Sequence, residues 1–136
     1  MKSQKFIASL IIALGAVFML SGAVTYNLVH VKLVAEKITV SPDSPHFANQ
    51  KIAGPWTAYA EASMISTHTL AATGGKTYAE LDREDPIREV AMTGSFLRAS
   101  LFTSVVSFGV AAFAGGVGLV FVLIGLFLLS LVRAKE

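Results

Sequence analysis

Residues 99–132 read ASLFTSVVSFGVAAFAGGVGLVFVLIGLFLLSLV and contain no Lys, Arg, Asp or Glu. A membrane span needs about 20 apolar residues, because a helix rises about 1.5 Å per residue and the hydrocarbon core is about 30 Å thick. A helix over this run would reach roughly 50 Å. We therefore expect it to begin outside the membrane, near residue 86, and to continue inward without a break.

A second uncharged run covers residues 6–31 and is also long enough to span. The run continues to Val31, past the small residues Ser21, Gly22 and Ala23 that would suit signal-peptide cleavage, which favours an uncleaved anchor. The hydrophobic fraction of the chain, 54%, is high for a soluble domain, and the charged fraction, 15%, is low. The sequence predicts a mainly α membrane protein, a two-helix transmembrane hairpin with a small, mostly helical external domain.

The charges outside the two runs predict the orientation. Lys2 and Lys5 precede the first run, and Arg133 and Lys135 follow the second. Short flanks rich in Lys and Arg stay in the cytoplasm. We expect a plasma-membrane protein with a cytoplasmic N-terminus (1–5), a first span (6–31), an extracytoplasmic domain (32–98), a second span (99–132) and a cytoplasmic C-terminus (133–136). The chain has no cysteine, so disulfides cannot stabilise this domain.

Small residues recur at a seven-residue interval in both runs. In lipid, helices associate through close backbone approach at such stripes rather than through a hydrophobic drive. We expect the two spans to pair antiparallel, stripe against stripe. Further small residues on the second span, including Ala112 and Gly116, leave room for an intermolecular contact. The predicted helix-packing residues are Ala8, Gly15, Gly22, Ser104, Ala111, Gly118 and Gly125.

The segment between the runs carries local structure signals. The β-branched residues at 38–40, followed by a turn-rich stretch, predict a short strand. Gly54 and Pro55 are typical of a helix start, and Gly74 with Gly75 of a helix end. Glu61 is the only charged residue of that helix at neutral pH. Such a helix is expected to rest on the membrane-proximal ends of the spans or on a partner.

Residues 74–90, GGKTYAELDREDPIREV, are dense in carboxylates. Thr77 and Glu80 form a capping-box pattern, which predicts a short helix starting at Thr77. Asp85 before Pro86 ends that helix and caps the next one. A phosphate-binding loop is disfavoured because Leu70 occupies the position of its first glycine, and a calcium loop because no central glycine follows the alternating acids.

Four blocks of the sequence are distinctive: AEKITV (35–40), GPWTAYA (54–60), GKTYAELDREDP (75–86) and SFLRASLFTS (95–104). They resemble a family of small two-pass actinobacterial membrane proteins commonly labelled "aromatic ring-opening dioxygenase LigA". The resemblance covers most of the chain from Leu33 to Phe113. The family label would imply oxygen-dependent cleavage of a catechol-like ring.

Ring cleavage by non-haem iron typically uses two histidines and a carboxylate. The candidates here are His46, His68 and Glu61, whose sequence spacing gives no recognisable metal motif. The residues favour a non-enzymatic accessory or scaffold subunit of a larger membrane or envelope assembly, such as a respiratory one. A ring-opening dioxygenase and an extracytoplasmic sensor are the alternatives.

The expected partners are the lipid bilayer and either a membrane protein or a second copy of the chain. No nucleic acid, catalytic residue or cofactor is predicted. The residues proposed as a contact surface are Trp56, Tyr59, Tyr78, Asp82 and Glu84.

Overall fold

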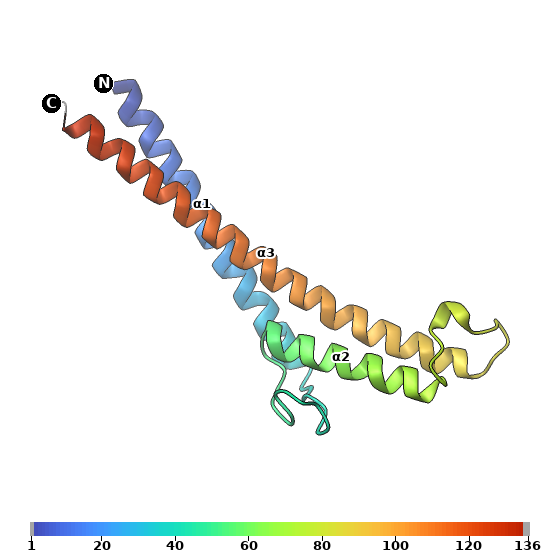
Figure 1. Ribbon diagram of the computed structural model, residues 1–136. Coiled ribbons are helices and arrows are strands. Elements are labelled where there is room, and N and C mark those ends of the chain that lie inside the picture. The colour runs from blue at the N-terminus through green and yellow to red at the C-terminus, as the bar shows by residue number, and fades with distance from the viewer. Residues whose placement is uncertain (1, 135–136) are drawn as a thin grey trace. The chain divides into compact units, whose positions relative to one another are not determined.

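The structure, a computed structural model, describes residues 2–134 and is mainly helical. Its elements are α1 (Lys2–Ala35), α2 (Pro55–Ala72), the 3-10 turn η1 (Tyr78–Glu80) and α3 (Ile87–Arg133), as Figure 1 shows. Helices α1 and α3 are both long and apolar enough to cross a membrane. The chain divides into two units, one of residues 2–28 with 108–134 and the other of residues 29–107. Each unit is described by itself.

The first unit is an antiparallel pair formed by α1 and the second half of α3 (Figure 1). Its buried residues repeat at heptad spacing, with Ala8, Gly15 and Gly22 on α1 facing Ala111, Gly118 and Gly125 on α3. Only 17% of the most apolar window of each helix is buried. Most of the apolar side chains on these helices therefore point outward.

In the second unit, α2 packs against the first part of α3. Helices α2 and α3 cross closely at Gly94, which is buried. A Cβ at this position would overlap the side chain of Thr69 on α2, so the close crossing requires glycine here. The largest fully buried side chains of this unit, Ile52 and Val40, come from the segment before α2. The core is completed by further buried apolar residues: Leu33, Ala58, Ala62, Leu81, Ala91 and Leu101.

The ends of α2 follow the predicted signals. Thr57 Oγ1 accepts hydrogen bonds from the N–H groups of Ala53 and Gly54, each 3.2 Å long, at the start of the helix. Gly74 and Gly75 have φ angles of +64° and +82°, a left-handed conformation that glycine adopts without a steric penalty. Gly75 N–H donates to the carbonyl of Leu70, which satisfies one of the last carbonyls of the helix.

The predicted strand at residues 38–40 is wrong, since residues 2–134 contain no strand. An isolated antiparallel bridge pairs Thr39 with Lys51, and the backbone hydrogen bonds beside it stop at Val40. The next N–H, that of Ser41, donates instead to the carboxylate of Glu61 at 2.6 Å. The segment is thereby held by α2, which prevents a longer ladder from forming.

The carboxylate-rich segment gives a turn and a helix start. The predicted short helix at Thr77 is a single 3-10 turn, η1, and Glu80 Oε2 accepts the Thr77 N–H at 2.8 Å as expected. The Thr77 hydroxyl also donates to the same carboxylate oxygen, at 2.7 Å. Asp85 Oδ1 accepts the N–H of Ile87 at 2.9 Å, so Asp85 caps α3 as predicted.

Candidate functional site

The line of contact between α1 and α3 is made of backbone against backbone. A Cβ on Gly15 would lie 2.6 Å from the carbonyl oxygen of Gly118, and a Cβ on Gly118 would lie 2.6 Å from that of Gly15. A Cβ on Gly22 would lie 2.6 Å from the carbonyl oxygen of Ala111. Real Cβ atoms essentially never come this near. These positions therefore have to be glycine if the helices are to keep this separation.

The predicted packing residues do not all lie on this line. A Cβ on Gly125 would lie 2.9 Å from the carbonyl oxygen of Ala8, which adds a third level of contact within the first unit. Ser104 belongs to the second unit, where it is half-buried and its hydroxyl donates to the carbonyl of Ser100 at 3.3 Å. The contact line in the first unit thus includes six of the seven predicted positions.

Aromatic contacts accompany the small residues in the first unit. Phe108 is fully buried, and its ring centroid lies 4.7 Å from that of Tyr26. Phe18 and Phe121 meet edge to face at 6.1 Å. Such pairs contribute about 0.5–1.5 kcal/mol beyond the area they bury. The heptad of small residues does not by itself predict either pair.

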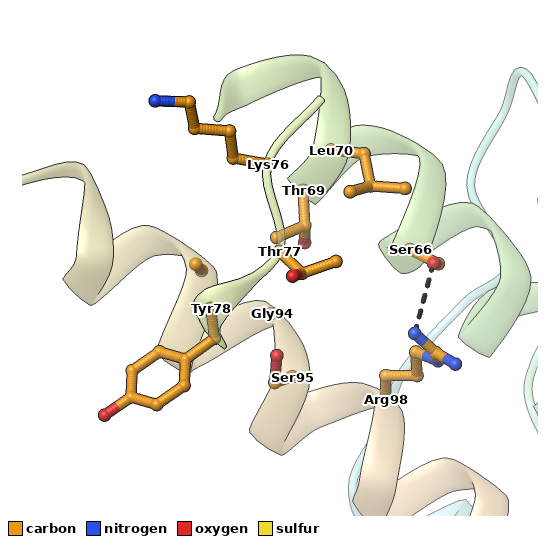
Figure 2. Close-up of a pocket in the computed structure, with 10 residues that line it drawn as sticks. Ser66, Thr69, Leu70, Lys76, Thr77, Tyr78, Gly94, Ser95 and Arg98 are labelled. Carbon is orange, nitrogen blue, oxygen red and sulfur yellow. Dashed lines mark hydrogen bonds between the residues drawn. The ribbon is translucent and has the colours of Figure 1, made fainter. Parts of the chain in front are cut away.

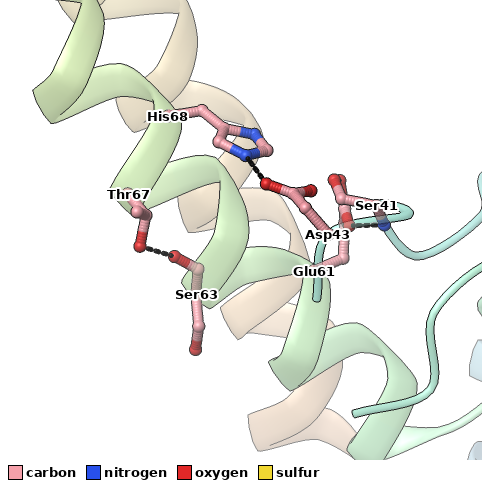
Figure 3. Close-up of polar contacts among 6 residues, drawn as sticks. All are labelled: Ser41, Asp43, Glu61, Ser63, Thr67 and His68. Atoms are coloured by element: carbon pink, nitrogen blue, oxygen red, sulfur yellow. Dashed lines mark hydrogen bonds and ion pairs between the residues drawn. The ribbon is translucent and has the colours of Figure 1, made fainter. Parts of the chain in front are cut away.

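In the second unit, a buried carboxylate on α2 holds the preceding loop. Glu61 is 8% exposed and accepts hydrogen bonds from the backbone N–H and the hydroxyl of Ser41, at 2.6 Å and 3.0 Å (Figure 3). A buried carboxylate needs such partners to offset its desolvation. The role of Glu61 in this structure is therefore to anchor the loop to α2.

A second contact between the same loop and α2 lies at the surface. His68 Nε2 donates to Asp43 Oδ2 at 2.7 Å (Figure 3). The hydrogen bond from His68 holds the pKa of Asp43 below its usual value. Both side chains are exposed, so this ion pair contributes little to stability on its own.

The three metal-ligand candidates are engaged elsewhere. Glu61 contacts Ser41, and His68 contacts Asp43. His46 lies in the loop, with its ring 6.5 Å from that of Phe47. Among residues 2–134, no three His, Cys, Asp or Glu side chains are grouped so that they could hold a metal ion.

The residues proposed as a contact surface fall into two groups. Trp56, 74% exposed, and Tyr59 lie in the first turns of α2, and Tyr59 meets Phe102 edge to face at 5.8 Å. Tyr78, Asp82 and Glu84 lie beyond its end and are exposed, and the Arg88 guanidinium sits 4.0 Å from the Tyr78 ring centroid. The first group thus lies at the start of α2, whereas Tyr78 lies beside its later turns, where it lines a cavity with Ser66 and Thr69.

A polar cavity of about 100 Å³ lies between α2, the segment that follows it, and α3. The hydroxyls of Thr69, Thr77 and Ser95 gather near its centre, and the Arg98 guanidinium approaches Ser66 at one side (Figure 2). Arg98 Nη1 donates to Ser66 Oγ at 3.4 Å, and the guanidinium also lies 5.5 Å from the Phe102 ring centroid. The Lys76 ammonium is directed away from the other labelled groups (Figure 2).

Sequence reasoning did not find this cavity, because its residues come from positions up to 32 apart. One signal was available. Gly94 interrupts an otherwise helical pattern, and a glycine inside a helix usually marks a close packing contact. That contact, with Thr69, brings the hydroxyls of α2 next to Ser95 and Arg98.

The resemblance to a family of two-pass membrane proteins, noted from the sequence, stays a prediction. Searches of protein-family models, of curated proteins and of solved structures find no match to this chain.

Proposed function

We propose that the chain is a two-pass integral membrane protein and serves as a non-enzymatic accessory or scaffold subunit of a larger membrane or envelope assembly. The observation that carries the proposal is the construction of the first unit. Its two helices meet through glycine backbone, while most of their apolar side chains remain uncovered. Outward-facing apolar side chains on helices of this length suit lipid as the surrounding solvent, and small-residue contacts are typical of membrane helix pairs.

The orientation follows from the charges beside the apolar runs. The two apolar runs are flanked at the chain termini by basic residues: Lys2, Lys5, Arg133 and Lys135. Short basic flanks favour cytoplasmic termini, and therefore an external segment at residues 32–98. Because the chain has no cysteine, single introduced cysteines test this directly. Asp82→Cys should react with a membrane-impermeant maleimide on intact cells, and Ser3→Cys should react only after the cells are opened. The reverse pattern would contradict the orientation.

The accessory role is supported by apolar surface on the second unit. Trp56 and Phe96 are 74% and 77% exposed, and Leu97 is 51% exposed. Large aromatic residues are enriched at the centres of protein interfaces. The one carboxylate of α2, that of Glu61, is buried and bonded to Ser41, so it adds no charge to the exposed surface of the helix.

The test is purification of the tagged full chain from its native membrane at native expression, in mild detergent, with mass spectrometry of what accompanies it. A stoichiometric membrane-protein partner, or a stable homo-oligomer, is expected. A monomer recovered with no partner would contradict the scaffold role. Metal analysis of the same sample distinguishes the dioxygenase alternative from the scaffold role, because one iron per chain would favour the enzyme.

A further inference from the structure

The polar cavity of the second unit has the features of a binding site for a small oxyanion. Thr69 and Ser95 line it, and in the part of the chain that the structure describes their hydroxyls have no hydrogen-bond partner. Each hydroxyl can donate one hydrogen bond. Ala91 and Gly94, both buried, form the apolar floor beside them.

Two charged residues line the cavity: Lys76, whose ammonium is directed away from the other labelled groups (Figure 2), and Arg98, which is weakly engaged. Within residues 2–134, Arg98 has no carboxylate partner, and its hydrogen bond to Ser66 is long, at 3.4 Å. Most of its five N–H donors therefore remain available. A guanidinium presents these donors as a planar fork that matches phosphate oxygens two at a time.

The neighbouring acid does not cancel this charge. Glu80 lies next to the lining residue Thr77, and its Oε2 accepts the Thr77 N–H and hydroxyl at 2.8 Å and 2.7 Å. The carboxylate is therefore occupied by Thr77, outside the group of residues that line the cavity. Thr77 in turn cannot donate its hydroxyl to a ligand while it bonds Glu80.

The size of the cavity limits its occupant. A volume of about 100 Å³ holds several water molecules, since one water needs roughly 10–15 Å³ on the same measure. Pockets for drug-sized ligands measure about 300–1,000 Å³. A phosphate group fits this limit, and the rest of any larger molecule that carries it would have to lie outside the cavity.

From the unpaired Arg98, the free hydroxyls and this volume, we propose that the cavity binds a phosphate group. The headgroup of a phospholipid is the source that its position favours. Arg98 is the last charged residue before the uncharged run 99–132, so if that run enters a bilayer, Arg98 is the charged side chain of that run's outer flank nearest to the lipid headgroups. This choice of source rests on the proposed membrane function, whereas the affinity for phosphate does not.

Two probes distinguish the sources, and both use the full chain in a phosphate-free maltoside detergent. The first is inorganic phosphate, titrated by ³¹P NMR. The second is phosphatidylglycerol, compared by native mass spectrometry with a diacylglycerol of the same acyl chains. Arg98→Gln removes the guanidinium, and Thr69→Val removes one hydroxyl with little change of shape. Arg83→Gln is the matched control, since Arg83 is exposed and does not line this cavity.

A lipid site predicts that phosphatidylglycerol is retained over diacylglycerol, that Arg98→Gln weakens retention about tenfold or more, and that Arg83→Gln binds as the unchanged protein does. Thr69→Val should weaken binding less, and it keeps the test valid if Arg98→Gln does not fold. Arg98-dependent binding of inorganic phosphate without a preference between the two lipids would support the site and assign it to soluble phosphate.

The proposal is overturned if neither probe's binding depends on Arg98 or Thr69. Failure of the membrane function is a separate result. A chain that stays in the soluble fraction of cells, yet binds inorganic phosphate through Arg98, would remove the proposed function and leave this site in place.

Discussion

Replacing Gly15 by alanine tests the contact line of the first unit most directly. The new Cβ would lie 2.6 Å from the Gly118 carbonyl oxygen and 2.8 Å from the Val122 nitrogen, whereas ordinary contact begins at 3.4 Å. Both atoms are backbone, so no side-chain rotation can relieve the overlap, and the helices must separate by about 0.8 Å. A gap of 0.5–1 Å already loses about a quarter to a half of a dispersion contact.

The expected loss of stability is about 1–3 kcal/mol, the usual range for an overpacked site. Alanine is also a better helix former than glycine by about 1 kcal/mol, which would mask part of the effect. Gly116→Ala supplies the matched control, because Gly116 is exposed on α3 and has no atom within 4 Å of its Cβ position. The difference between the two variants isolates the packing effect.

Helix separation can be followed by fluorescence transfer between labels on cysteines introduced at Ser3 and Ser130, both exposed in the first unit. The labelled chain in dodecyl maltoside is titrated with dodecyl sulfate until the helices part. Gly15→Ala should shift the transition to lower dodecyl sulfate, and Gly118→Ala should do the same because the contact is reciprocal. Free energies of unfolding for Gly15→Ala and Gly116→Ala that agree within about 0.5 kcal/mol would refute the contact line.

Three further predictions concern the second unit. Glu61→Leu should lower the free energy of unfolding by about 1–3 kcal/mol, because it leaves the Ser41 N–H buried without an acceptor; proteolysis of the loop before α2 should accelerate, and Glu61→Gln should be milder. The Thr77 N–H and hydroxyl lower the pKa of Glu80 from 4.5, so a ¹³C titration of its carboxyl should show a midpoint below that value. The capped turn should be fully stable above the ordinary pKa and lost as the pH falls through the lowered one; a midpoint at or above 4.5 would disprove the cap. Trp56→Ala should change the unfolding free energy of the isolated chain by less than about 0.5 kcal/mol, since the side chain is 74% exposed, and a larger loss would show that Trp56 is packed within the chain.

Local signals in the sequence predicted the helices and their ends well. Pro55 and the pair Gly74-Gly75 mark the limits of α2 because they act through backbone geometry at the position itself. The recurrence of Gly15 and Gly22 predicted a contact stripe, since a helix places residues seven apart on one face. These features depend on neighbours within about two turns.

The remaining features depend on residues far apart in the chain. Ser41 meets Glu61 and Asp43 meets His68 across 20 and 25 positions, and no local pattern encodes either contact. The predicted strand failed for the same reason, because its next backbone donor was taken by a side chain of α2. In the sequence, Arg98 is recognisable only as the last charged residue before the uncharged run 99–132. The residues that line the cavity with it are brought together only in the folded unit.

The even spacing of the glycine contacts has a consequence for how the helix pair finds its alignment. If α1 slid by seven residues along α3, about 10 Å, Gly15 would face Gly125 and Gly22 would face Gly118, so small residues would still oppose one another. Glycines alone therefore leave the two alignments nearly equivalent. The slide would, however, separate Tyr26 from Phe108, whose rings now lie 4.7 Å apart. The aromatic pair thus selects one of several alignments that the small residues permit.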